Sequence, residues 1–128
     1  MSQREVVFTD KAPEPGPYSQ AIKYGNLVFV SGQTPEYPDT NEPCHGSITE
    51  QTELVFNNIK AVLEAAGSSL AKVLKVTIFL TDIRLKPEMN EVYVKFFPKD
   101  PPARIALACK DLDDPLHVIE VDVIAAAD

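Results

Sequence analysis

Apolar and β-branched residues are concentrated in six short segments, a pattern typical of strands. These segments are Arg4–Thr9, Ser19–Tyr24, Leu27–Ser31, Val73–Thr81, Ala103–Lys110 and Val118–Ala126. The dipeptide Gly25-Asn26 joins the second and third segments and predicts a two-residue hairpin loop. The run from Leu27 to Val30 is apolar at every position, so we expect that strand to be covered on both faces.

Two further segments have the spacing of amphipathic helices. Ser47 and Glu50 form a capping-box pattern, and Gly67 is a natural stop for the helix that would follow. Pro87 suits the first turn of a second helix, which Pro98 would end. The apolar positions with helical spacing are Val55, Ile59, Val62, Leu63 and Ala66 in the first, and Met89, Val92, Tyr93, Phe96 and Phe97 in the second.

The resulting order, β-ββ-α-β-α-ββ, predicts an α+β sandwich with two helices on one face of a mixed sheet. Irregular loops are expected at Ala12–Pro17 and Thr34–Gly46, which are rich in Pro, Gly and polar residues. A length of 128 residues is typical of one domain, so residues 1–128 are expected to form a single unit.

Composition and charge exclude several classes of function. The net charge of −7 gives no electrostatic basis for binding a nucleic-acid backbone or an anionic membrane. No apolar run approaches the length of a membrane span, and the first residues lack the layout of a signal peptide. Two cysteines are too few for a disulfide framework, which favours a reducing compartment.

The last strand has one face that does not suit a simple monomer. By strand alternation, Ile119, Val121 and Val123 form an apolar face that suits packing on helices. The other face carries Val118, Glu120, Asp122 and Ile124. Such a mixed face is compatible either with solvent or with packing against another subunit.

Arg104 stands in an otherwise apolar strand with the small residues Ala106 and Ala108 on its own face. Ile105, Leu107 and Cys109 occupy the opposite face and are expected in the core. A guanidinium in small surroundings suits a carboxylate ligand, which it can bind through two hydrogen bonds. The alternatives are an exposed arginine on an edge strand or a structural ion pair with Glu120.

Other polar residues fall where strands end or a helix begins. Glu120 could activate a water as a general base, or it could be solvated or paired with an arginine. Hydroxyls at Tyr18 and Ser31, with Gly32 next to Ser31, could bind a small polar ligand, although Tyr18 could equally be a packing residue. Asn90, in the first turn of the second predicted helix, could be an ordinary surface residue.

No metal or cofactor is expected from the sequence. Cys44-His45 has no second ligand pair at zinc spacing, and the other histidine, His117, begins a predicted strand. Motifs for phosphate binding, for a nucleophilic serine elbow and for a zinc protease do not occur.

Taken together, several motifs resemble those of the Rid family, the reactive-intermediate deaminases also called YjgF-type proteins, over nearly the whole chain. They are Gly16-Pro17-Tyr18-Ser19-Gln20-Ala21, Val30-Ser31-Gly32-Gln33, Glu64-Ala65-Ala66-Gly67, Val76-Thr77-Ile78-Phe79-Leu80-Thr81-Asp82, Met89-Asn90-Glu91-Val92-Tyr93 with Phe96-Phe97, Pro102-Ala103-Arg104 and Ile119-Glu120-Val121. The family pattern differs at Ile105 and Ala106, at the longer segment Leu112-Asp113-Asp114-Pro115 and at Val121.

The resemblance implies a chorismate-mutase-like fold, a homotrimer with a central barrel and ligand sites between subunits. It implies hydrolysis of 2-imino acids, or of enamines such as 2-aminoacrylate, to 2-oxo acids and ammonia without a cofactor. The carboxylate-binding arginine corresponds to Arg104 and the water-orienting glutamate to Glu120. The remaining site residues are then Tyr18, Ser31, Gly32, Asn90 and Ala106.

Two other functions are compatible with the same resemblance. One is a non-enzymatic trimer that binds small carboxylates or acts like a chaperone. The other is a ribonuclease or translation inhibitor, which the charge of −7 and the lack of a catalytic histidine pair argue against. Cytoplasmic localisation is expected, with a mitochondrial location left open, and the physiological substrate is not identified.

Overall fold

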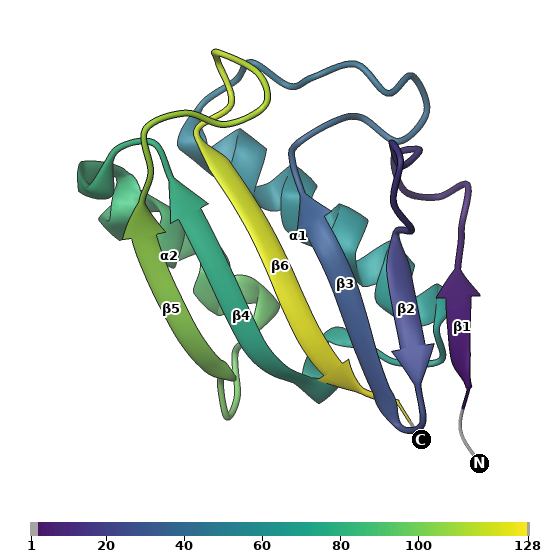
Figure 1. Ribbon diagram of the computed structural model, residues 1–128. Coiled ribbons are helices and arrows are strands. Elements are labelled where there is room, and N and C mark those ends of the chain that lie inside the picture. Colours follow the sequence, from purple (N-terminus) through teal and green to yellow (C-terminus); the bar gives the residue numbers. More distant parts are fainter. Residues whose placement is uncertain (1–2, 128) are drawn as a thin grey trace.

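Six strands form one sheet, and both long helices pack on the same face of it (Figure 1). The computed structural model describes residues 3–127. The strands are β1 (Arg4–Val7), β2 (Ala21–Tyr24), β3 (Leu27–Gln33), β4 (Val73–Leu80), β5 (Ala103–Ala108) and β6 (Ile119–Ala126). The helices are α1 (Ile48–Ala65) and α2 (Lys86–Phe96), with short 3₁₀ turns η1 (Leu70–Lys72) and η2 (Ile83–Leu85).

The strand order across the sheet is β1-β2-β3-β6-β4-β5. Neighbouring strands are antiparallel except for β4 and β5, which are parallel and joined through α2. A parallel pair needs a long crossover connection, and α2 supplies it. The expected α+β architecture, with two helices on one face of a mixed sheet, is therefore confirmed.

Local signals in the sequence explain where the elements begin and end. Ser47 caps α1 by accepting a hydrogen bond from the Glu50 backbone N–H, while the Glu50 side chain accepts one from the Ser47 backbone. After α1, Gly67 takes a positive φ of 79° that other residues rarely adopt. Gly25, at φ 59°, lies in the predicted hairpin between β2 and β3.

The core lies between the helices and the sheet face that they cover. Phe56 of α1 packs against three aromatic rings from α2 and the residue after it, Tyr93, Phe96 and Phe97, at centroid distances of 5.7, 5.4 and 5.7 Å. Tyr93 is only 5% exposed, so its ring, which also contacts Arg104, is fixed by the core. Within residues 3–127, no helix combines the length and apolar character needed to cross a membrane.

In the described part of the chain, no helix covers the other face of the sheet, called here the outer face (Figure 1). Two predictions are wrong for this reason. Phe29 is 43% exposed, so the strand from Leu27 is covered on one face only, and Ile105 is 49% exposed although it was expected in the core. Leu107 and Cys109 are half-buried rather than core residues.

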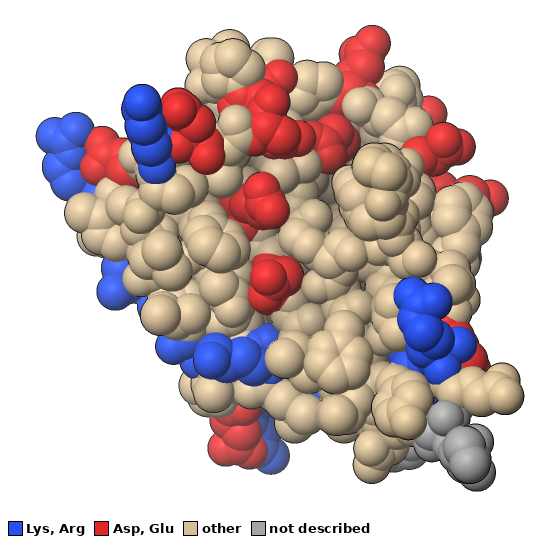
Figure 2. All heavy atoms as spheres, in the orientation of Figure 1, with Lys and Arg blue, Asp and Glu red and all other residues tan. Residues whose placement is uncertain are grey.

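The strand register identifies which side chains share the outer face. Glu120 pairs with Phe79, which in turn pairs with Leu107, so all three point to the outer face. The apolar residues of this face include Ile22, Phe29, Phe79, Ile105, Leu107 and Ile124. Figure 2 shows the face largely uncharged, with acidic side chains gathered along its upper edge.

Candidate functional site

A bulge in β3 creates the cleft at the upper end of the sheet. Val30 pairs with Val123 and Gln33 pairs with Val121, so β3 uses one more residue than β6 over this stretch. Ser31 and Gly32 occupy the bulge, which bends the strand and releases it from regular pairing. The Ser31 Oγ donates a hydrogen bond to the Ser19 carbonyl at 2.6 Å, which ties the bulge to the segment that carries Tyr18.

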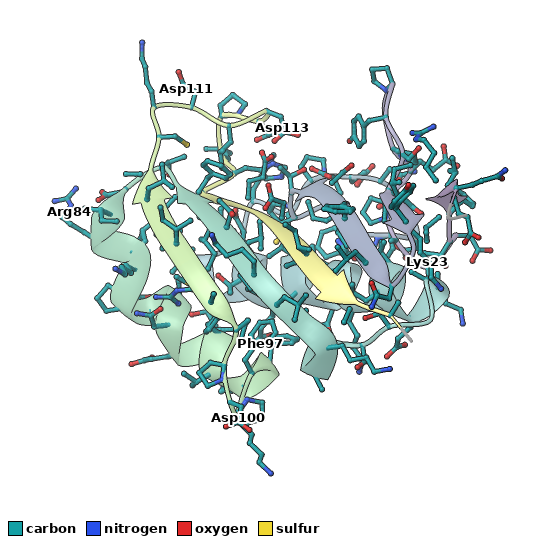
Figure 3. All side chains as sticks on the ribbon, turned by 60° about the horizontal axis from the view of Figure 1, so that its bottom comes forward. Lys23, Arg84, Phe97, Asp100, Asp111 and Asp113 are labelled. Carbon is teal, nitrogen blue, oxygen red and sulfur yellow. The ribbon has the colours of Figure 1, made fainter. Side chains whose placement is uncertain are left out.

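The cleft has a volume of about 370 Å³ and opens beside the bulge. It is lined by Tyr18, Ser31, Gly32, Thr34, Asp113 and Glu120. Asp113 comes from the loop before β6, at the end of the sheet where β6 begins (Figure 3). Four of the seven site residues expected from the sequence, Tyr18, Ser31, Gly32 and Glu120, are therefore brought together.

Glu120 lies directly against Gly32. A Cβ built on Gly32 would overlap Glu120 Oε2 and lie 3.3 Å from its Cδ. Glycine is needed here because of this close approach, and the approach brings the carboxylate onto the backbone of the bulge.

The pKa of Glu120 is raised above its ordinary value of 4.5. Partial burial is the largest cause, and the negative charges of Asp113, Asp122 and Glu36 add to it, while His117 acts in the opposite direction. A carboxylate whose charged form is disfavoured is a stronger base than an ordinary glutamate, which suits proton transfer from water.

Arg104 lies elsewhere, on the helix-covered face of β5. Its Nη1 donates a hydrogen bond to Asn90 Oδ1 of α2 at 2.7 Å, and its Cζ lies 4.7 Å from the centre of the Tyr93 ring. Asn90 takes one of five guanidinium N–H donors, so Arg104 has donors for a bidentate carboxylate ligand as well. Ala106 is on the same face of β5 and packs partly against the core.

Arg104 and Glu120 point to opposite faces of the sheet. Arg104 pairs with Val76, whose other partner is the buried Val123, whereas Glu120 pairs with the outer-face residue Phe79. Arg104 and Glu120 also do not lie on neighbouring strands, because β4 separates β5 from β6. Among the expected site residues, Arg104, Asn90 and Ala106 therefore form one group, and the four residues of the cleft form another.

The sequence does not single out Thr34 as a site residue, and Asp113 stands out there only as part of a longer loop. Thr34 follows Ser31-Gly32-Gln33 directly, so its position after a strand end was the available signal. The two histidines, His45 and His117, have ring centroids 6.2 Å from each other. Both are held by carboxylates: His45 by Asp114 at 3.0 Å and His117 by Asp113 at 2.9 Å.

Comparison with known proteins relates this geometry to one family. The family model described as Endoribonuclease L-PSP matches residues 9–127, nearly the whole chain. The chain belongs to this family, also called the YjgF or Rid family. The Rid architecture seen here is shared with E. coli TdcF, whose crystal structure with bound serine has a TM-score of 0.90 and 34% identity, covering 97% of this chain and 99% of that one.

Two curated Rid relatives extend the comparison. A RutC family protein of Pyrococcus abyssi is 51% identical over 123 residues, which cover 95% of this chain and 96% of the relative. The chloroplastic Reactive Intermediate Deaminase A of Arabidopsis thaliana is 43% identical over 125 residues, covering 96% of this chain and 66% of the relative.

Proposed function

We propose that this protein hydrolyses 2-imino acids, and enamines such as 2-aminoacrylate through their imine tautomers, to 2-oxo acids and ammonia. The observation that carries the proposal is Glu120, a half-buried carboxylate with a raised pKa in a small cleft against the backbone of Gly32. Membership of a family with a member named Reactive Intermediate Deaminase supports it. TdcF with bound serine supports a site for a small molecule that carries a carboxylate and a nitrogen.

The proposed reaction has two stages, the addition of water and the loss of ammonia. Glu120 accepts a proton from water as the water oxygen attacks the carbon of the protonated imine, forming a carbinolamine. Glu120 returns this proton to the nitrogen and then accepts the hydroxyl proton as the C–N bond breaks, so ammonia leaves and the carbon becomes the carbonyl of a 2-oxo acid. The proton left on Glu120 passes to the released ammonia or to water, which restores the carboxylate. The protonated imine is already electrophilic, so positioning the water and the imine is the main contribution of the protein.

Arg104 is proposed to bind the substrate carboxylate, and Asn90 to position Arg104. Since Arg104 and Glu120 point to opposite faces of one sheet, a site that contains both needs two chains. We propose a homotrimer in which the cleft of one chain meets Arg104 and Ala106 of the next. The exposed apolar residues of the outer face, Phe29 and Ile105 among them, support such an assembly.

A coupled assay tests the proposed reaction. An amino-acid oxidase generates a series of 2-imino acids in situ, and the rate at which the imine is consumed is compared with and without the protein. Acceleration of hydrolysis with release of the 2-oxo acid is the expected result. No acceleration with any imine of the series would contradict the proposal.

A non-enzymatic binder of small carboxylates is the second candidate, and the bound serine of TdcF is the observation that favours it. Binding of 2-oxobutyrate in a way that needs Arg104, without any acceleration of imine hydrolysis, would support that function instead. Ribonuclease activity, which the family description suggests, suits this chain poorly because the carboxylates of Asp113, Asp114 and Glu36 surround both histidines and would repel a phosphodiester.

The proposed trimer predicts the effect of a charge on the outer face. Wild-type protein is expected to sediment at about three times the 14.1 kDa mass of one chain. Ile105→Asp, which places a charge among apolar residues, is expected to sediment as a monomer. Val94→Asp is the control, because Val94 is 56% exposed and lies on α2. A monomeric wild-type protein would contradict the assembly.

Gly32→Ala is expected to lower kcat about 10²-fold while the melting temperature changes little. The added methyl group displaces only the end of the Glu120 side chain, so the fold has no need to adjust. Steady-state kinetics and thermal denaturation measure the two effects. Wild-type kcat in Gly32→Ala would show that the position of the Glu120 carboxylate does not matter for turnover.

The raised pKa of Glu120 predicts a shifted acid limb in the pH profile of kcat/KM. Glu120 must be deprotonated to accept a proton, so activity falls on acidification at a higher pH than the ordinary value of 4.5 for a glutamate. Asp122→Asn removes one of the charges that raise this pKa, so its acid limb is expected at lower pH than in the wild type. An acid limb that does not move in Asp122→Asn would assign the titration to another group.

A further inference from the structure

A second cavity, of about 320 Å³, adjoins the cleft at Asp113, which lines both. Its walls include Glu36 from the loop after β3, together with Asp113, Asp114 and His117 from the loop before β6. The ligand atoms of Glu36, Asp113 and His117 all lie within 4.8 Å of one another. The proposed deamination gives none of Glu36, Asp114 or His117 a part.

His117 is the decisive residue because it is 1% exposed and, within the described residues, its Nε2 forms no hydrogen bond. Its Nδ1 lies 2.9 Å from Asp113 Oδ1, a pairing that selects the tautomer of the neutral ring with the proton on Nδ1 and the lone pair on Nε2. Nε2 lies 3.5 Å from Glu36 Oε2 but forms no hydrogen bond with any of residues 3–127. A buried nitrogen of this kind is costly unless something binds it.

The separation of Nε2 and Oε2 has the value expected for two ligands of one metal ion. With metal–ligand bonds of about 2.0–2.2 Å and a tetrahedral angle, two ligand atoms lie about 3.4 Å apart. A carboxylate on the other ring nitrogen, as Asp113 provides, is the usual outer partner of a metal-bound histidine. Thr34 Oγ1 orients Glu36 in turn, donating to its carboxylate at 2.7 Å.

We propose that Glu36 and His117 bind a divalent transition-metal ion, with zinc as the best match, and that Asp113 orients His117. Water in the cavity completes the coordination shell. The ion would join the loop after β3 to the loop before β6, the two loops that supply Thr34 and Asp113 to the cleft. The sequence predicts no metal site because the two ligands lie in separate loops, where no spacing motif reveals them.

Zinc binding is measured by isothermal titration calorimetry on full-length protein previously dialysed against a chelator. The wild type is expected to bind one ion per chain. Glu36→Gln is expected to weaken binding at least about tenfold, and Asp113→Asn by about 10–100-fold. His45→Gln is the matched control, since His45 is the neighbouring histidine and bonds to Asp114, and its affinity is expected to stay within about twofold of the wild type.

Two results would overturn the proposal. The first is the absence of saturable zinc binding by the wild type. It would mean that a proton on Nε2, shared with Glu36, takes the position proposed for the metal ion. The second is a loss of affinity in His45→Gln equal to that in Glu36→Gln, which would assign the ion to a different set of ligands. The Glu36 side chain is 21% exposed, so its substitution tests the site even if the buried His117 tolerates none.

Discussion

Arg104→Ala is expected to lower kcat/KM for 2-iminobutyrate by about 10²–10⁴-fold, because it removes two charge-assisted hydrogen bonds of about 1.5–3 kcal/mol each. The anchoring of Arg104 by Asn90 and Tyr93 means that the guanidinium is already in place before substrate arrives. Arg104→Lys keeps the charge but loses the planar fork, so it is expected to recover only part of the loss.

Arg84→Ala is the control for Arg104→Ala. Arg84 is exposed and pairs with Asp82 at 2.7 Å, and its loss is expected to leave kcat/KM unchanged. Sedimentation of each variant verifies that the assembly persists. Wild-type kcat/KM in assembled Arg104→Ala protein would exclude Arg104 from the site.

Glu120→Gln is expected to lower kcat by about 10²–10⁴-fold with little change in KM. Glutamine keeps the size of the side chain and its contact with Gly32, but it cannot accept the proton from water. In the proposed site Arg104 binds the substrate carboxylate, so substrate binding is expected to be retained. Steady-state kinetics with several imines separate the two parameters.

Asp122→Asn is the matched control for Glu120→Gln. Asp122 is two residues further along β6 on the same outer face, and it too loses one negative charge. Its kcat at neutral pH is expected to stay near that of the wild type. Equal losses of kcat in the two variants would mean that the charge of the outer face, rather than proton transfer by Glu120, governs turnover.

The elements of the fold could be predicted because their signals are local. The capping box at Ser47, the proline at position 87 and the Gly25-Asn26 turn each fix an element boundary within a few residues. Helical and strand periods then assign the apolar faces of α1 and β6. For the strands and helices, the observed ends differ from the predicted ends by a few residues. For example, β1 ends at Val7 rather than at Thr9.

The arrangement of the site could not be predicted in the same way. Strand alternation separates Arg104 from Ile105, but it does not say which of the two faces the helices cover, and an apolar face was assumed to be the buried one. In the structure Ile105 is 49% exposed, while Arg104 rests on the Tyr93 ring. The insertion of β4 between β5 and β6 is a property of the whole sheet, which no local pattern reveals.

Loop residues were the least predictable part. Thr34, Glu36, Asp113 and His117 meet only because two loops far apart in the sequence cross the same end of the sheet. Localisation in the cytoplasm stays a prediction, as curated relatives include one named chloroplastic and one named mitochondrial.

The most direct test of a site shared between chains is complementation between two inactive variants. Arg104→Ala chains carry native Glu120, and Glu120→Gln chains carry native Arg104. In trimers assembled at random from equal amounts of both, about a quarter of the sites receive both native residues, because each site joins one chain to the next. Differently tagged chains verify that mixed trimers form, and a double variant in place of Arg104→Ala is the control.

The mixed trimers are expected to recover roughly a quarter of wild-type deaminase activity, while each variant alone and the control mixture stay at background. Background activity in verified mixed trimers would contradict a site shared between chains, because Arg104 and Glu120 would then not act together across two chains.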